Sequence, residues 1–317
     1  MTVTQDAFRR KWSPAATLTL LPGAASAHAS EGGFVLLLPT GAYITAGSIS
    51  VAATVLLLAF LPDRWLAALF RPVTLFRPRR GALRTATSCA AFLLAMVLLW
   101  AGIAGPRDPL ANPLPLTVWT LFWVAFILLT GLLGNLWPWL NPWSGPLALI
   151  RSTGLTAPWH LPHRTAPWLA LAGFLAFACF LLADPAPADP ARLARAAGLY
   201  WLAVMAGGLA FGPRFLWRAE AFSVLFRAYG RLALFGRSRG RLALGLPGWQ
   251  ILRAPVPSAG FATMMVVLLG TGSFDGLNET FRWLAFLGIN PLEFPGRSAV
   301  VWQNLAGLFT FNLALLA

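Results

Sequence analysis

Residues 86–105 read ATSCAAFLLAMVLLWAGIAG, and this apolar run decides the fold. At 1.5 Å per residue, about 20 helical residues cross the roughly 30 Å hydrocarbon layer of a bilayer. The run contains no Asp, Glu, Lys or Arg, so no side chain in it requires water. It therefore predicts a helix that crosses a membrane.

Similar runs recur along the whole chain. Of 317 residues, 58% are hydrophobic and 11% are charged, whereas soluble domains carry about 25% charged residues. The sequence predicts an all-α polytopic transmembrane bundle of about seven spans, because a helix satisfies all its backbone hydrogen bonds within lipid. The other six spans are predicted at residues 42–61, 116–137, 166–183, 193–212, 257–276 and 298–317.

The net charge of +14 comes almost entirely from arginine, and the arginines lie between the apolar runs. If the mature N-terminus is outside, the inner connections 62–85, 138–165 and 213–256 hold 6, 2 and 8 arginines, and the outer segments hold five. This is the positive-inside pattern. It predicts a multi-pass protein of a bacterial inner membrane with a periplasmic N-terminus, and it argues against nucleic-acid binding.

The inner connections mix arginines with large apolar residues. Residues 63–80 and 215–234 fit either simple positive-inside anchors or amphipathic segments on the inner leaflet, with arginines facing anionic phospholipids. Residues 137–143 read WPWLNPW, which predicts a rigid turn with tryptophans in an interfacial belt.

The N-terminus is typical of a secretory signal peptide over residues 1–27. Residues 9–11 are basic, residues 15–21 are apolar, and small residues recur at 25, 27 and 29, so cleavage falls before His28 or before Ser30. Residues 28–317 then form a single transmembrane domain. The sequence stops at Ala317 inside an apolar run, which predicts either a longer natural chain or a partner membrane subunit.

The outer end of the sixth span is the most site-like place in the sequence. Residues 270–276 read GTGSFDG, where Asp275 could bind a metal ion or act as a base toward water. Asn278, Glu279, Gln303 and Asn304 are predicted to share an outer cleft with it. The alternative is a helix cap with interhelical hydrogen bonds.

His28 offers a second candidate metal site. If cleavage leaves it N-terminal, its α-amine and imidazole form a chelate for a divalent metal such as copper, and Glu31 could add an oxygen ligand. The alternative is that these residues only belong to the cleavage region.

The order of these features resembles bacterial polytopic membrane proteins known as fenitrothion hydrolases. The resemblance rests on the Ala-His start, NPW at 141–143, EAF at 220–222 and GTGSFDG at 270–276. It implies a membrane-bound hydrolase that cleaves the P–O–aryl bond of organophosphorus esters at the periplasmic face. Two alternatives stay open: a non-enzymatic or copper-handling subunit of a larger complex, and a permease for a neutral solute, suggested by the amides at Asn135, Gln303, Asn304 and Asn312.

Overall fold

The computed structural model describes residues 40–77 and 81–317. The chain divides into two units, which are described separately, residues 1–62 and residues 63–317. The first unit contains α1 (Thr40–Phe60), an apolar helix whose side chains at 41–57, 59 and 60 are exposed. The predicted signal peptide lies outside the described residues.

Five helices in the described residues are long and apolar enough to cross a membrane, which makes the chain a multi-pass membrane protein. They coincide with five of the predicted spans. They are α3 (Ala82–Ala104), the continuous run of α4 (Pro113–Pro115), η2 (Leu116–Ala125) and α5 (Phe126–Leu133), α8 (Ala166–Ala183), α9 (Pro190–Phe211) and α12 (Ala259–Asn278). Two shorter apolar helices, in α1 and α14 (Val301–Leu316), match the first and seventh predicted spans, whose crossing stays a prediction.

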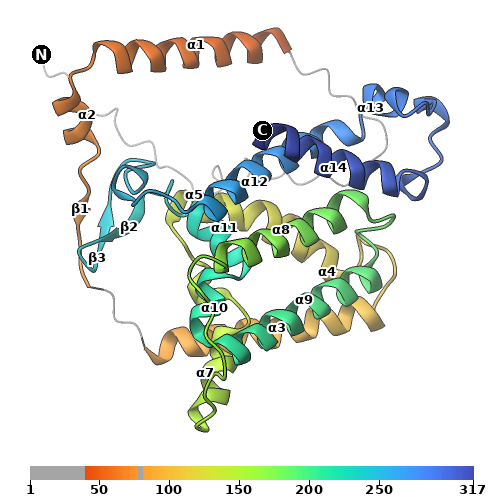
Figure 1. The fold of residues 1–317 in the computed structure, drawn as a ribbon, viewed down its shortest axis with the longest axis horizontal. Coiled ribbons are helices and arrows are strands. Elements are labelled where there is room, and N and C mark those ends of the chain that lie inside the picture. The colour runs from red at the N-terminus through yellow and green to blue at the C-terminus, as the bar shows by residue number, and fades with distance from the viewer. Residues whose placement is uncertain (1–39, 78–80) are drawn as a thin grey trace, which may run out of the picture. The chain divides into compact units, whose positions relative to one another are not determined.

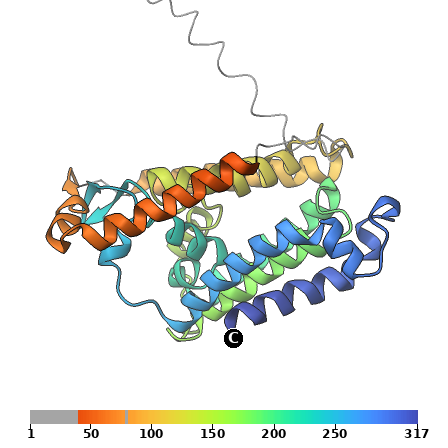
Figure 2. The same ribbon diagram turned by 90° about the horizontal axis from the view of Figure 1, so that it is seen from above.

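The long helices of the second unit run side by side (Figure 1). α12 packs against α8 and α14, α14 also packs against α8, and α3 packs against α9. The short helix α11 (Ala221–Tyr229) lies between α5 and α8 in the middle of this unit (Figure 2), and α10 (Pro213–Arg218) precedes it and packs mainly against α9. The core therefore surrounds α11, which is too short to cross a bilayer.

The two ends of this bundle differ in charge. At one end, hydrogen bonds from Trp119 Nε1 in η2 to the Pro187 carbonyl and from Arg297 Nη2 to the Leu181 carbonyl in α8 each join a long helix to a connection. All three ion pairs of the described residues are found here, so we call it the paired end. They are Arg107–Asp189, Arg192–Asp184 and Arg297–Glu279.

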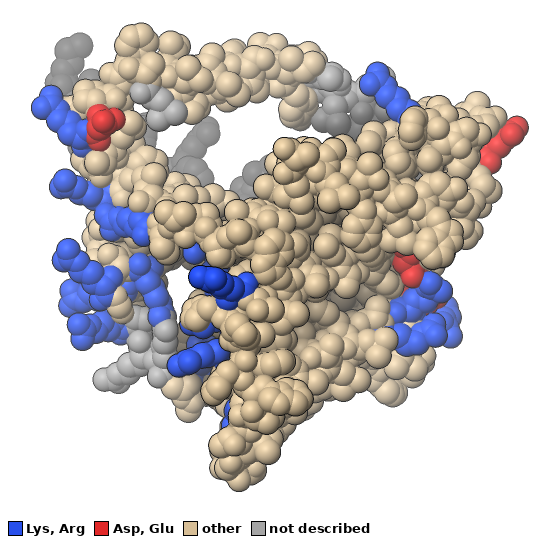
Figure 3. Space-filling model, viewed as in Figure 1, with Lys and Arg blue, Asp and Glu red and all other residues tan. Residues whose placement is uncertain are grey.

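The opposite end, here called the arginine end, carries α7 (Ser144–Ser152), α10 and a small sheet. Figure 3 shows Lys and Arg side chains gathered over the sheet, on the left of the view. This separation of charge agrees with the predicted inner and outer connections. The side of the membrane that each end occupies stays a prediction.

The described residues are mostly helical, as the all-α prediction expects, and they also contain one small sheet that was not predicted. Its three antiparallel strands have the order β1-β3-β2, with Val73 opposite Leu244 and Ser238 opposite Arg241. Its strands are β1 (Val73–Thr74), β2 (Phe235–Ser238) and β3 (Arg241–Leu244). Strands this short give little alternating pattern, so the connections appeared only as basic loops.

Two local predictions were wrong, and the structure excludes one of the two alternatives left open for residues 221–226. The third span ends at Leu133 rather than at residue 137, because Gly134 has a φ of 117° that favours glycine. Residues 221–226 are buried in the core rather than lying on a leaflet. Trp137 and Trp143 are buried too, so they do not belong to an interfacial belt.

Candidate functional site

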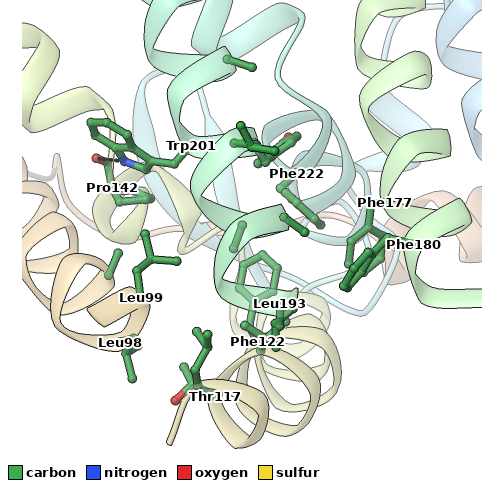
Figure 4. Close-up of a pocket in the computed structure, with 18 of the residues that line it drawn as sticks. Leu98, Leu99, Thr117, Phe122, Pro142, Phe177, Phe180, Leu193, Trp201 and Phe222 are labelled. Carbon is green, nitrogen blue, oxygen red and sulfur yellow. Dashed lines mark hydrogen bonds between the residues drawn. The ribbon is translucent and has the colours of Figure 1, made fainter. Parts of the chain in front are cut away.

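An aromatic cavity of about 500 Å³ lies between α3, η2, α8 and α9 (Figure 4). Aliphatic and aromatic side chains provide almost all of its lining. The labelled members in the close-up are Leu98, Leu99, Thr117, Phe122, Pro142, Phe177, Phe180, Leu193, Trp201 and Phe222. Leu199 also lines the cavity and is 68% exposed near the middle of α9. Because Leu199 lies near the middle of a candidate span, we expect the mouth of the cavity to face the hydrocarbon layer.

One wall of the cavity is an unusual helix. η2 is a π-helix of 10 residues, and the amide of Phe126 that follows it donates to the Leu121 carbonyl, five residues earlier. π-helical turns are rare and occur frequently at functional sites. This wider winding holds Thr117 and Phe122 at the cavity. The π-helix therefore lies directly at the wall of the aromatic cavity.

The indole N–H groups around the cavity are already bonded to protein acceptors. Trp119 Nε1 donates to the Pro187 carbonyl at 3.3 Å. Trp143 Nε1 donates to the Trp201 carbonyl at 3.0 Å, and Trp201 Nε1 donates to the Pro142 carbonyl at 3.3 Å. These tryptophans offer a ligand their ring surfaces rather than hydrogen bonds. Such a lining suits an uncharged molecule, because a charge there would lack compensation.

A buried carboxylate, that of Glu220, holds part of the cavity wall in place. Glu220 is 1% exposed and caps the N-terminus of α11. Its Oε1 accepts from the Tyr200 hydroxyl at 2.6 Å and from the Phe222 amide at 2.8 Å. Its Oε2 accepts from the Ser223 amide at 2.6 Å and from Trp137 Nε1 at 3.2 Å. Tyr200, Trp137 and Phe222 all line the cavity, so Glu220 fixes three of its wall residues.

Glu220 lies deep in the bundle. Tyr200 stands near the middle of α9, and the Phe222 ring meets Phe122 edge-on at a centroid distance of 4.9 Å. The predicted spans contain no Asp, Glu, Lys or Arg near their centres, yet the short helix α11 brings a glutamate there from a connection. An ionisable group inside a membrane bundle usually marks function. Sequence reasoning missed this residue, although an acid within a strongly basic connection was a usable signal.

The predicted cleft around Asp275 is divided by the structure. Asn278 and Asn304 are buried, whereas Asp275, Glu279 and Gln303 are exposed. None of the five lines the aromatic cavity.

Two of these residues have partners that fit the structural alternative. Asn304 accepts from Trp283 Nε1 at 3.1 Å and donates to the Leu182 carbonyl at 3.3 Å, so it joins helices. Glu279 pairs with Arg297 at 3.6 Å. A catalytic or metal-binding role for Asp275 stays a prediction.

The predicted copper ligands His28 and Glu31 lie outside the described residues. Among residues 40–77 and 81–317, no three His, Cys, Asp or Glu side chains are close enough together to hold a metal ion. Comparisons with family models, with curated proteins and with solved structures find no match for this chain.

Proposed function

We propose that this membrane protein binds an uncharged, lipophilic small molecule in the aromatic cavity and takes it directly from the bilayer. The observation that carries the proposal is the cavity itself, with an apolar lining and a mouth at Leu199 between spans. Its volume of about 500 Å³ lies within the roughly 300–1,000 Å³ of small-molecule pockets.

The rings around the cavity favour an aromatic ligand. Phe122, Phe177 and Trp201 present ring surfaces, and aromatic pairs stabilise each other by about 0.5–1.5 kcal/mol beyond the burial of their area. A flexible acyl chain would fill the same volume but would gain less from these rings. An aryl compound of low polarity is therefore the expected ligand.

A nitroaromatic ester tests this proposal because nitrophenyl groups quench tryptophan fluorescence. Purified protein in an uncharged detergent is titrated with a dialkyl 4-nitrophenyl phosphate, and saturable quenching reports binding. The variant Ala197→Phe places a ring in the cavity and should weaken binding at least tenfold, which corresponds to about 1.4 kcal/mol. The matched control Ala172→Phe, on an exposed face of α8, should bind as the wild type does. Equal quenching in both variants would refute the cavity as the site.

Hydrolysis of such an ester is the second candidate function, and the fit of an uncharged aryl ester to this lining favours it. The same titration reports hydrolysis, since cleavage of the P–O–aryl bond by water releases yellow nitrophenolate and a dialkyl phosphate. The cavity lining supplies only the hydroxyls of Thr117 and Tyr200 as polar side chains besides indoles. We therefore expect binding without turnover unless a further group acts. If turnover occurs and is abolished by Asp275→Asn but not by Ala197→Phe, hydrolysis takes place at Asp275 and outside the cavity, because Asp275 does not line it.

A further inference from the structure

Among the described residues that line the aromatic cavity, only Thr117 has a polar side chain whose hydrogen-bonding capacity is unused. The Tyr200 hydroxyl donates to Glu220 Oε1 at 2.6 Å. The indole N–H groups all donate to backbone carbonyls or to the side chains of Glu220 and Ser223; they belong to Trp119, Trp137, Trp143 and Trp201. A hydrogen bond between a ligand and a side chain of this lining is therefore expected at Thr117.

The Thr117 hydroxyl is not bonded to its own helix. A threonine within a helix can donate to the carbonyl four residues earlier, as Thr45 does to Gly41 at 2.8 Å in α1. Four residues before Thr117 stands Pro113, whose carbonyl accepts from the Leu116 amide instead. In the part of the chain that the structure describes, Thr117 Oγ1 has no hydrogen-bond partner. Because a hydroxyl both donates and accepts, it can bond to a ligand group of either kind.

Thr117 stands at one end of the cavity. Figure 4 shows it at the lower edge of the lining, with Trp201 and Phe222 at the upper edge. It lies at the start of η2, two residues before Trp119, whose indole bonds to a connection at the paired end. A ligand whose rings contact Phe122 and the aromatic side chains beyond it would therefore have its other end beside the Thr117 hydroxyl.

From this arrangement we infer that Thr117 determines specificity, and that the ligand is an aryl compound with a hydrogen-bonding group at one end, such as a phenol. The inference rests on the proposed function, because it concerns the ligand of the same cavity. A hydrocarbon of the same shape would fill the cavity but would leave the hydroxyl without a partner. A compound with the matching group gains one hydrogen bond in apolar surroundings.

The experiment is a competition titration with the full chain in an uncharged detergent. Two compounds of nearly the same shape, 4-hydroxybiphenyl and 4-methylbiphenyl, displace the nitrophenyl ester that quenches tryptophan fluorescence. Each displacement curve gives a Kd for the competing compound. Partition of a compound into detergent micelles is the same for every variant, so it cancels when that compound is compared across variants.

Thr117→Val keeps the shape of the side chain and removes its hydroxyl. This variant should bind 4-hydroxybiphenyl about fivefold more weakly, which is the effect of a typical hydrogen bond, and should not weaken the binding of 4-methylbiphenyl. Thr117→Ser retains the hydroxyl and should bind 4-hydroxybiphenyl as the wild type does. Thr120→Val is the matched control, because Thr120 is exposed on the same helix and does not line the cavity, and it should bind both compounds normally.

The outcomes distinguish this inference from the proposed function. If both compounds displace the ester and Thr117→Val weakens both equally or neither, Thr117 does not select the ligand. The inference then fails, while the cavity remains the binding site. Displacement by 4-methylbiphenyl also shows that the Thr117→Val protein is folded. If neither compound displaces the ester from the wild type, or if Ala197→Phe leaves their binding unchanged, the proposed function fails and the inference fails with it.

Discussion

Replacing Glu220 by glutamine tests the central packing of the bundle. The two oxygens of Glu220 accept four hydrogen bonds from groups that are shielded from water. Glutamine keeps one oxygen and replaces the other with an NH₂ group. The best orientation keeps the oxygen toward the Ser223 amide and Trp137 Nε1. The new NH₂ then faces the Tyr200 hydroxyl, which can turn and accept from it.

The Phe222 amide, however, cannot turn. It donates to Oε1 at 2.8 Å in the wild type and would meet another donor in the variant. A buried donor without an acceptor costs about 1–3 kcal/mol, and the neutral amide also loses the stronger charge-assisted bonds. We therefore expect Glu220→Gln to lower the free energy of unfolding by about 2–3 kcal/mol. At about 2–4 °C per kcal/mol, the melting temperature should fall by roughly 5–10 °C.

The assay is thermal unfolding followed by tryptophan fluorescence in a mild detergent. Glu293→Gln is the matched control, because that side chain is exposed and the change should stay within about 0.5 kcal/mol. Tyr200→Phe removes a single bond and should cost about 1 kcal/mol. If Glu220→Gln melts at the same temperature as Glu293→Gln, the carboxylate does not hold α11 in place and the reasoning is refuted.

Two further changes probe helix packing and pH dependence. Gly102→Ala should lower the free energy of unfolding by about 1–3 kcal/mol, because a Cβ there would lie 2.9 Å from Ala194 Cβ and would press α3 away from α9. Gly131→Ala is the control, because the space around Gly131 is open, and its thermal unfolding should show no loss of stability. Despite partial burial, hydrogen bonds from Arg192 and the backbone hold the pKa of Asp184 below its ordinary value of 3.8. Its stabilising effect is thus present above that value and is lost as the pH falls through the lowered pKa. The melting temperatures of wild type and Asp184→Asn should accordingly differ at pH 7 and converge as the pH drops below 3.8; a constant difference down to acid unfolding would contradict this.

The lengths of the apolar runs in the sequence predicted the candidate membrane-spanning helices well. Five predicted spans match the helices to within a few residues, because lipid leaves the backbone no alternative to internal hydrogen bonds. The predicted end of the third span was wrong because Gly134 stops the helix inside an apolar run, where hydropathy does not change. The β-strands were not predicted, because pairing partners such as Val73 and Leu244 are distant in sequence.

The candidate site was less predictable than the fold. An apolar cavity forms from residues that sequence reasoning assigns to lipid or to core, since both environments select the same side chains. Glu220 stood in a connection full of arginines, and only the packing of α11 reveals it as a buried group. Asp275 attracted notice as a polar residue in an apolar run, but its side chain is exposed. Polarity alone did not show which groups converge.

The buried position of α11 has a consequence for how the protein is made. A helix of nine residues that begins beside a carboxylate is not recognised as a span by the insertion machinery. It can dock only after Phe122, Phe177 and Tyr200, all earlier in the chain, have reached the bilayer. A chain whose synthesis stops before residue 220 would lack α11, and the side chains that pack against this helix would be left uncovered. We expect membrane proteases to remove such a nascent fragment.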